Sequence, residues 1–353
     1  MAIAPYTAVA LQLTAQSIER ASDVAAARAQ IAGQIAALEG KIRSARIFIE
    51  QYGGSPVKLV VLPEYLFTSY PGRISIPDFA ARAGFAADGP EYAALGGIAQ
   101  RLGLFIAGNA YETDRAFPDF YFQTSFIVAP SGDVVLRYRR LLSMFAPSPH
   151  DVLDRYIDAH GPDALFPVAD TAIGRLAAIA SEEILYPEIA RVLAFKGAEL
   201  FCHSSSEIGS PLATAKDIAK RARAFENMAW VVSANTAGIE GTAMPLMSAD
   251  GNSQVVAPSG KLLAQSGSGE TFTAFAEIDI EHSREQRRQP AMVNSLARQR
   301  PGLFAPAYGE AAAQFQAGNL MLGADGKPRV PDREMFVKMQ RDVIEKLAKA
   351  GVI

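Results

Sequence analysis

The chain has 353 residues, a formal net charge of −3 with acids and bases mixed along its length, and 49% hydrophobic residues. These values are those of a globular protein large enough to bury a sizeable core. They argue against a nucleic-acid-binding protein, which would need a basic face, and against a membrane-spanning one, because no apolar run reaches about 18 residues.

The N-terminal part alternates between β-strand and α-helix signals. Residues 7–13 and 58–62 are short apolar runs that favour strands. Between them, apolar residues recur at the spacing of one helical face, namely Val24, Ile31, Ile35, Leu38, Ile42 and Ile49. Ser22 or Asp23 can cap this helix, and Gly53-Gly54 can end it. The order strand, helix, strand is typical of an α/β fold.

The same alternation continues to residue 234. The patterns predict helices at residues 92–102, 187–195 and 217–228, and strands at residues 104–107, 123–129, 176–180, 199–203 and 230–234. Pro187 near the start of the second of these helices suits a first helical turn. We therefore expect helices packed against sheets throughout this part of the chain.

One motif occurs twice. Residues 127–132, Ile-Val-Ala-Pro-Ser-Gly, recur as Val-Val-Ala-Pro-Ser-Gly at residues 255–260, and an apolar strand follows each copy. Proline and glycine at these places predict a β-turn, so each copy is expected to form a hairpin. Two α/β halves with matching hairpins indicate one domain with internal pseudo-symmetry.

The C-terminal stretch has a different character. Residues 309–331 are polar and contain several glycines and prolines, and Asp332 can then cap a final helix. One face of that helix is apolar, with Phe336, Met339, Val343 and Leu347. We expect a main domain at residues 1–308 and an extension at residues 309–353. The apolar face either packs on its own domain or contacts a partner subunit.

Two charged residues stand at the ends of predicted strands. Glu64 directly follows the apolar run 58–62, where α/β sheets form ligand crevices, and its carboxylate can act there as a general base. A helix cap or a surface ion pair would use the same residue. In the hairpin strand that ends at Arg140, alternation places Arg137 and Arg139 on one face and Arg140 on the other. Arg140 either lies on a solvated edge or projects inward to stabilise an oxyanion.

Ser181 is the candidate nucleophile. It lies between an apolar strand and a helix, at the kind of turn that exposes a nucleophile beside backbone N–H groups. The surrounding sequence is not GxSxG. A Ser-His-Asp triad has little support, because of the four histidines only His203 stands at the end of a neighbouring strand. A histidine in that place is more often a structural residue than a base.

Signals for metals, cofactors and export are missing from the sequence. It has no CxxC, HExxH or EF-hand pattern, and no GxGxxG or Walker A motif, so we expect neither a metal nor a cofactor. Cys202 is the one cysteine, which rules out a disulfide within the chain and fits a cytoplasmic protein. The N-terminal residues lack the basic and apolar segments of a signal peptide.

Together these segments resemble the carbon–nitrogen hydrolase (nitrilase-like) superfamily from about Thr7 to Phe304. Leu62-Pro63-Glu64-Tyr65, followed by Tyr70-Pro71-Gly72, is similar to the family's general-base motif. The other similar segments, in chain order, are residues 138–141, 180–191, 196–200, 222–227, 252–260 and 298–301. Several motifs in the right order are far more specific than any one alone.

The resemblance implies a four-layer αββα sandwich that forms a homodimer or larger homo-oligomer. It also implies a cofactor-free Glu–Lys–Cys triad that acts on amides or nitriles of small molecules. This chain keeps Glu64, but Arg140 stands for the lysine and Ser181 for the cysteine. Asp151 and Asp154 are candidates for the family's second acid. Substrate or oxyanion contacts are expected from Glu182, Glu183, His203 and Tyr70.

These departures leave three explanations open. A serine hydroxyl is much harder to ionise than a thiol, and arginine cannot shuttle a proton as lysine can. The chain is therefore an amide-hydrolysing or acyl-transfer enzyme with an unusual nucleophile, or a catalytically inactive relative that binds a small molecule or a partner. The third explanation, a cysteine replaced to trap substrate, leaves Arg140 unexplained. The polar lining around Ser181 favours the enzyme, because buried polar groups are costly to keep.

Overall fold

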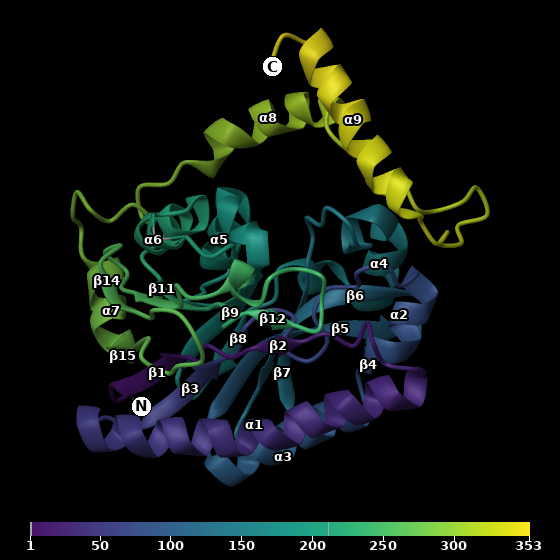
Figure 1. The fold of residues 1–353 in the computed structure, drawn as a ribbon. Coiled ribbons are helices and arrows are strands. Elements are labelled where there is room, and N and C mark those ends of the chain that lie inside the picture. Colours follow the sequence, from purple (N-terminus) through teal and green to yellow (C-terminus); the bar gives the residue numbers. More distant parts are fainter. Residues whose placement is uncertain (1, 211) are drawn as a thin grey trace.

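The computed structural model describes residues 2–210 and 212–353, without the side chains of residues 119 and 333. Two β-sheets lie face to face between outer helices (Figure 1). The first sheet, in spatial order, contains β15 (Phe275–Ile278), β1 (Tyr6–Ala10), β3 (Val57–Val61), β5 (Phe105–Asp114), β6 (Phe117–Val128) and β7 (Val134–Arg139), with β4 (Phe85–Ala86) paired to β5. The second contains β14 (Leu262–Gln265), β13 (Gln254–Val256), β11 (Trp230–Ala234), β10 (Leu200–Ser204), β9 (Gly174–Ala180) and β8 (Ala169–Thr171). A short pair joins β2 (Ala15–Gln16) to β12 (Ile239–Glu240).

Helices cover the outer face of each sheet. Those on the first sheet are α1 (Val24–Gly53), α2 (Ile76–Ala83) and α3 (Pro90–Leu102), and those on the second are α5 (Pro187–Phe195) and α6 (Ala215–Asn227). The others are α4 (Leu153–His160), α7 (Ile280–Arg288), α8 (Pro301–Ala311) and α9 (Arg333–Lys349). These layers form the predicted αββα sandwich. Among the described residues, no helix has the length and apolar character needed to cross a membrane.

Hydrophobic side chains fill the spaces between the layers of the sandwich. Between the two sheets, residues such as Leu59 and Val61 of β3 pack with Ala178 of β9 and Val232 of β11. A second core lies between the first sheet and its helices. Because side chains of a strand alternate between its faces, strands buried on both sides need nearly continuous apolar sequence. This is why residues 58–62 and 176–180 stood out as apolar runs.

Helix α1 closely matches the predicted helix. Asp23 caps it by accepting a hydrogen bond from the Ala26 N–H, and Gly54 ends it in the left-handed conformation with φ of 77°. The predicted face is buried from Ile31 to Ile49. The exception is Val24 in the first turn, which is 45% exposed. The spacing of apolar residues alone could not show that the side chain in this first turn remains exposed.

The buried face of α1 gives a stability prediction. Ile35→Ala is expected to lower the free energy of unfolding by about 2–5 kcal/mol, because it leaves a cavity at a side chain that is 1% exposed. Ile47→Ala on the same helix removes a side chain that is 52% exposed and should cost less than about 0.5 kcal/mol. Urea denaturation of both variants measures the difference. Equal losses would contradict the assigned face.

The two sheets repeat one topology. In the first sheet β1, β3 and β5 are parallel and an antiparallel hairpin, β6–β7, follows them. In the second, β9, β10 and β11 are parallel and the hairpin is β13–β14. Gly132 and Gly260 lie at the two hairpin turns with φ of 93° and 78°, values that favour glycine. The predicted equivalence of the two hairpins is therefore confirmed.

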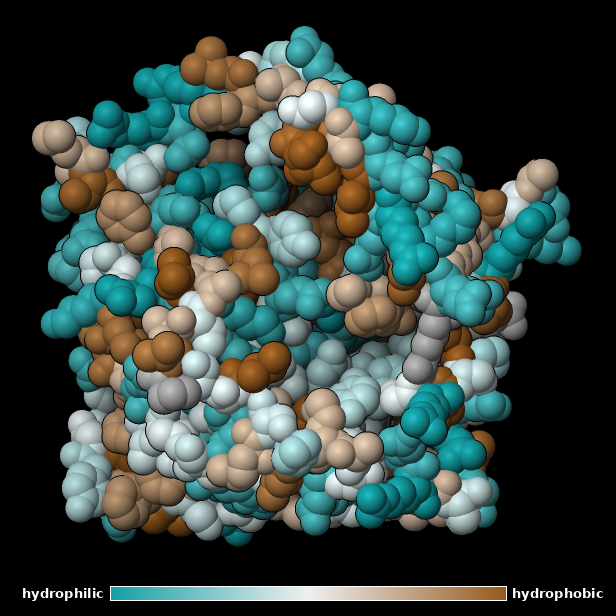
Figure 2. Space-filling view, turned by 45° about the horizontal axis from the view of Figure 1, so that its top comes forward, coloured by the Kyte–Doolittle hydropathy of each residue, from teal (hydrophilic) through white to brown (hydrophobic). Residues whose placement is uncertain are grey.

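The C-terminal elements form an arch over the helices of the second sheet (Figure 1). Helix α8 touches the body where the Tyr308 hydroxyl donates to Glu188 Oε1 at 2.7 Å. In α9, Asp332 is the predicted cap, and Phe336 and Met339 pack against the core of the first sheet. Figure 2 shows apolar side chains gathered on the arch and around the hollow beneath it. Leu303 and Phe304 of α8 are 74% and 55% exposed.

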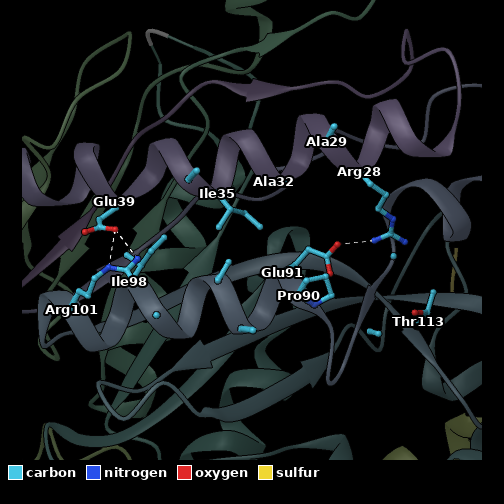
Figure 3. A pocket seen from close by; sticks show the side chains of 16 residues that line it. Arg28, Ala29, Ala32, Ile35, Glu39, Pro90, Glu91, Ile98, Arg101 and Thr113 are labelled. Atoms are coloured by element: carbon cyan, nitrogen blue, oxygen red, sulfur yellow. Dashed lines mark hydrogen bonds and ion pairs between the residues drawn. The ribbon is translucent and has the colours of Figure 1, made fainter.

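A groove of about 880 Å³ lies on the opposite side of the molecule, between α1 and α3 (Figure 3). Alanines and Gly97 form much of its wall, and two ion pairs bridge it, Arg28 with Glu91 and Arg101 with Glu39. Small side chains and paired charges account for the groove as a helix-packing seam. It contains none of the residues that the sequence singled out as a site.

Candidate active site

Ser181 begins a short 3₁₀ helix, η3 (Ser181–Leu185), directly after β9. Its φ is 47°, in the left-handed region that non-glycine residues rarely adopt. Strained residues of this kind persist where the surrounding structure holds them, and they gather at functional sites. The side chain is 4% exposed. The turn thus fixes the hydroxyl at the carboxyl end of a central parallel strand.

His203 holds this turn from the neighbouring strand β10. Its Nε2 lies 2.7 Å from the Ser181 carbonyl oxygen, and its Nδ1 lies 2.8 Å from the Ser233 hydroxyl. Because a carbonyl oxygen can only accept, Nε2 carries the proton and Nδ1 accepts. Burial lowers the pKa of His203 well below its ordinary range, so the ring is neutral. His203 therefore orients the Ser181 backbone and does not reach its hydroxyl as a base.

Glu64 and Arg140 come together between the ends of β3 and β7. Arg140 Nη1 lies 3.7 Å from Glu64 Oε1, and Gln123 joins them by accepting from Arg140 at 2.7 Å and donating to Glu64 at 2.5 Å. The guanidinium also pairs with Glu182 and donates to the Leu142 carbonyl. Glu64 is fully buried, and its Oε2 has no hydrogen-bond partner among the described residues. One carboxylate oxygen is thus left for a bound molecule.

The predicted alternation along β7 is confirmed. Arg137 and Arg139 both pair with Glu112, at 3.1 and 2.8 Å, on one face of the strand. Arg140 lies on the other side, toward Glu64, and is only 6% exposed. The alternative of a solvated edge is therefore wrong for Arg140. Its burial beside the carboxylates of Glu64 and Glu182 fixes the position of the guanidinium.

Glu183 ties the Ser181 turn to the end of β7. Its carboxylate accepts hydrogen bonds from the N–H groups of Leu141 and Leu142 at 2.8 and 2.9 Å and from the Tyr138 hydroxyl at 2.7 Å. The side chain is fully buried. Its partners are thus protein groups, and they set the distance between the nucleophile turn and the segment that carries Arg140.

Burial gives Glu183 an effect on stability that depends on pH. It raises the pKa of Glu183 from 4.5 to about 7, while Arg140 and the hydrogen bonds act in the opposite direction. Between these values the unfolded chain ionises Glu183 and the folded chain keeps it protonated. We therefore expect stability to fall by about 3 kcal/mol across this interval as pH rises, relative to Glu183→Gln. Urea denaturation of both proteins from pH 4 to pH 8 tests it, and parallel profiles would contradict it.

A lysine that the sequence did not single out reaches Ser181. Lys216, in the first turn of α6, places Nζ 3.3 Å from Ser181 Oγ and 3.2 Å from Ser205 Oγ. Within the described residues the Ser181 hydroxyl bonds to this amine and not to Glu64 or Arg140. Lys216 stands 35 positions from Ser181. It lies on a helix, where a lysine is an ordinary residue. No spacing in the sequence marks it.

Other predicted residues lie nearby or have separate tasks. Tyr70 packs edge-on against Tyr65, the residue after Glu64, at a ring distance of 6.4 Å. Asp151 is buried and accepts from the Ser148 N–H and hydroxyl and from Gln316, as a helix cap does. Asp154 is exposed. Asp151 is thus engaged in a capping box with Ser148. Among the described residues, no hydrogen bond or ion pair joins either aspartate to Ser181, Glu64 or Arg140.

A family model for carbon-nitrogen hydrolases matches residues 23–288. The chain belongs to this family. An omega-amidase of Xenopus laevis is 24% identical over 241 residues, which cover 68% of this chain and 83% of that protein. A chloroplastic omega-amidase of Arabidopsis thaliana is 27% identical over 264 residues, which cover 74% of this chain and 68% of that protein.

Solved structures agree in fold with this carbon-nitrogen hydrolase. A nitrilase-superfamily member of Saccharomyces cerevisiae has a TM-score of 0.60 at 21% identity and covers 82% of this chain and 96% of its own. A carbon-nitrogen hydrolase of Helicobacter pylori has a TM-score of 0.62 at 20% identity and covers 86% and 98%. Identities this low support the shared sandwich, while the chemistry has to be argued from the site.

Proposed function

We propose that this carbon-nitrogen hydrolase cleaves the carboxamide bond of a small molecule through an ester formed on Ser181. The observation that carries the proposal is the fixed Ser181 turn, whose hydroxyl lies within hydrogen-bond reach of an amine. Nucleophile, partner and orienting group are the parts that covalent catalysis requires. Omega-amidases among the relatives favour an amide over a nitrile as substrate.

Arg140 and the backbone N–H of Glu182 are assigned to the oxyanion. Arg140 donates to Gln123 and Leu142 and pairs with Glu182, and a guanidinium has five N–H groups, so donors remain for a substrate oxygen. Glu182 lies in the first turn of η3, where backbone N–H groups lack partners within the helix. Fixed donors of this kind stabilise the charge that develops on a tetrahedral intermediate.

Glu64 is assigned to the water that releases the acyl group. Its Oε2 is buried and has no hydrogen-bond partner in the described part of the chain, so it can accept a proton from a water molecule at the ester. Arg140 Nη1 lies 3.7 Å from its Oε1, so the other carboxylate oxygen is the one that faces the water. The cycle forms the ester and releases ammonia or an amine, and water then breaks the ester to give a carboxylate.

Ammonia release from monoamides of short dicarboxylic acids and from simple aliphatic amides tests the proposal. We expect turnover of at least one class by the wild type and none by Ser181→Gly, which keeps the left-handed backbone without the hydroxyl. A wild type that binds these amides without hydrolysing them would favour the inactive binding protein. Turnover that persists in Ser181→Gly would refute the assigned nucleophile.

A further inference from the structure

The contacts of Lys216 form a small connected set. Its amine lies 3.3 Å from Ser181 Oγ and 3.2 Å from Ser205 Oγ, and Ser205 is fully buried. The Ser205 backbone is fixed in turn, because its N–H donates to the Ala234 carbonyl and its carbonyl accepts from the Glu64 N–H. One serine thus holds the amine, and the other faces it at the end of β9.

The start of α6 fixes the position of Lys216. Thr214 caps the helix in a reciprocal capping box with Asp217, whose carboxylate also accepts from Gln254 at 2.9 Å. One turn later, the fully buried Lys220 bonds Glu207 at 2.8 Å. A helix end tied down on several sides can hold a side chain at the distance that proton transfer requires.

We propose that Lys216 is the general base that takes the proton from Ser181, in place of Glu64, to which the family resemblance assigns this step. The inference deepens the proposed function and rests on Ser181 as its nucleophile. Ser205 is a positioning residue, because it contacts the amine and not the reacting atoms. Glu64 keeps its role in the later step, in which it takes a proton from the water that releases the acyl group.

The chemistry of the two departures supports this assignment. Arg140 cannot give up its proton, and a carboxylate is a weak base for a hydroxyl. A neutral amine is a much stronger base, and serine–lysine pairs are an established form of activated nucleophile. Ser181 replaces the thiol of the family's triad, and Arg140 replaces its lysine. The Lys216 amine, 3.3 Å from Ser181 Oγ, supplies a base for the hydroxyl and a group that can give up its proton.

The charges around Lys216 determine how readily it becomes neutral. Burial lowers the pKa of Lys216 below its ordinary value of 10.5, and Lys220 on the same helix acts in the same direction. Glu64 after β3, Glu207 after β10 and Glu182 in η3 oppose them. The net lowering increases the fraction of neutral amine near pH 8, and a general base works best when its pKa lies near the working pH.

The proton is conserved through the step. As Ser181 Oγ forms a C–O bond with the amide carbon, its proton passes to Lys216 Nζ and the carbonyl becomes an oxyanion. Lys216 then returns the proton to the leaving nitrogen, the C–N bond breaks, and ammonia or an amine departs. The ester on Ser181 and a neutral Lys216 remain.

Labelling by a fluorophosphonate tests this role without knowledge of the substrate. The reagent forms a P–O bond with an activated serine and releases fluoride, so its rate reports Ser181 activation alone. We expect Lys216→Met and Lys216→Arg to lower the labelling rate by about 10²–10⁴-fold. The exposed control Lys261→Met should label as the wild type does, and Glu64→Gln should lose far less of the labelling rate than either Lys216 variant. The wild-type rate should rise with pH along one ionisation below 10.5.

The outcomes separate the two proposals. Labelling that survives in both Lys216 variants, or that is lost in Glu64→Gln, overturns Lys216 as the base. A wild-type Ser181 that does not react overturns it as well. Labelling that depends on Lys216, in a protein that hydrolyses no amide, supports the serine–lysine pair and refutes the amidase function. Circular dichroism of each variant checks folding, and Lys216→Arg keeps the charge in case Lys216→Met does not fold.

Discussion

Replacing Ser181 by alanine or glycine is expected to lower kcat/KM for amide hydrolysis by about 10⁴-fold or more, because the acyl group loses its attachment atom. Alanine keeps the strained left-handed backbone and glycine relieves it, so the two variants separate loss of the hydroxyl from loss of the turn. Steady-state ammonia release provides the measurement. Ser268→Ala, at an exposed serine, is the control and should retain wild-type turnover.

If the two Ser181 variants differed, with glycine active and alanine inactive, the strained backbone would be the sensitive feature. The hydroxyl would then not be the nucleophile. Activity at the wild-type level in both would remove Ser181 from the mechanism, and the polar groups around it would need another explanation.

Arg140→Met is expected to lower kcat by about 10²–10³-fold and stability by about 3–5 kcal/mol. The guanidinium is buried beside Glu64 and Glu182, and methionine leaves Glu64 as a buried charge without its cation. Arg140→Lys keeps the charge but loses the planar fork that reaches Gln123 and Glu182 together. It should fall between the wild type and Arg140→Met in both measurements.

The control for this prediction is Arg115→Met, which removes an arginine whose ion pair with Asp88 is 90% and 71% exposed. Exposed pairs contribute at most about 1 kcal/mol, so its stability should stay close to that of the wild type. Urea denaturation and kcat are measured on all three variants. An Arg140→Met protein with unchanged kcat would remove Arg140 from the oxyanion.

Much of the fold could be read from the sequence because periodic burial leaves a pattern. The face of α1 repeats at helical spacing, and the duplicated Ala-Pro-Ser-Gly turns mark two hairpins that prove equivalent. The second half of β5 and the first half of β6 were missed. In β5 the strand contains polar residues such as Asn109 and Glu112, which a pattern search reads as loop. In β6 the missed start contains Pro118, which argues against a strand. Asn109 and Glu112 are both buried, and Glu112 is paired with two arginines, which no local sequence could show.

The candidate site was only partly predictable for a related reason. Glu64, Arg140 and Ser181 each follow a strand, so topology placed them at sheet edges where residues from distant segments meet. For His203 the resemblance implied a substrate or oxyanion contact, and a structural role was the alternative. Its bonds to the Ser181 carbonyl and Ser233 fit the structural role. Lys216 enters from the start of a helix, and only the tertiary path of the chain brings it to Ser181. Its role could not be read from spacing.

In the proposed mechanism Ser181 carries the acyl group. Rapid-quench mass spectrometry of the wild type and of Glu64→Gln with p-nitrophenyl butyrate tests it most directly. We predict a butyryl mass increase that maps to the peptide containing Ser181, accumulates further in Glu64→Gln because water is no longer activated, and is absent from Ser181→Gly. Release of nitrophenol with no acylated peptide, or with the butyryl group on another residue such as Cys202, would contradict the account.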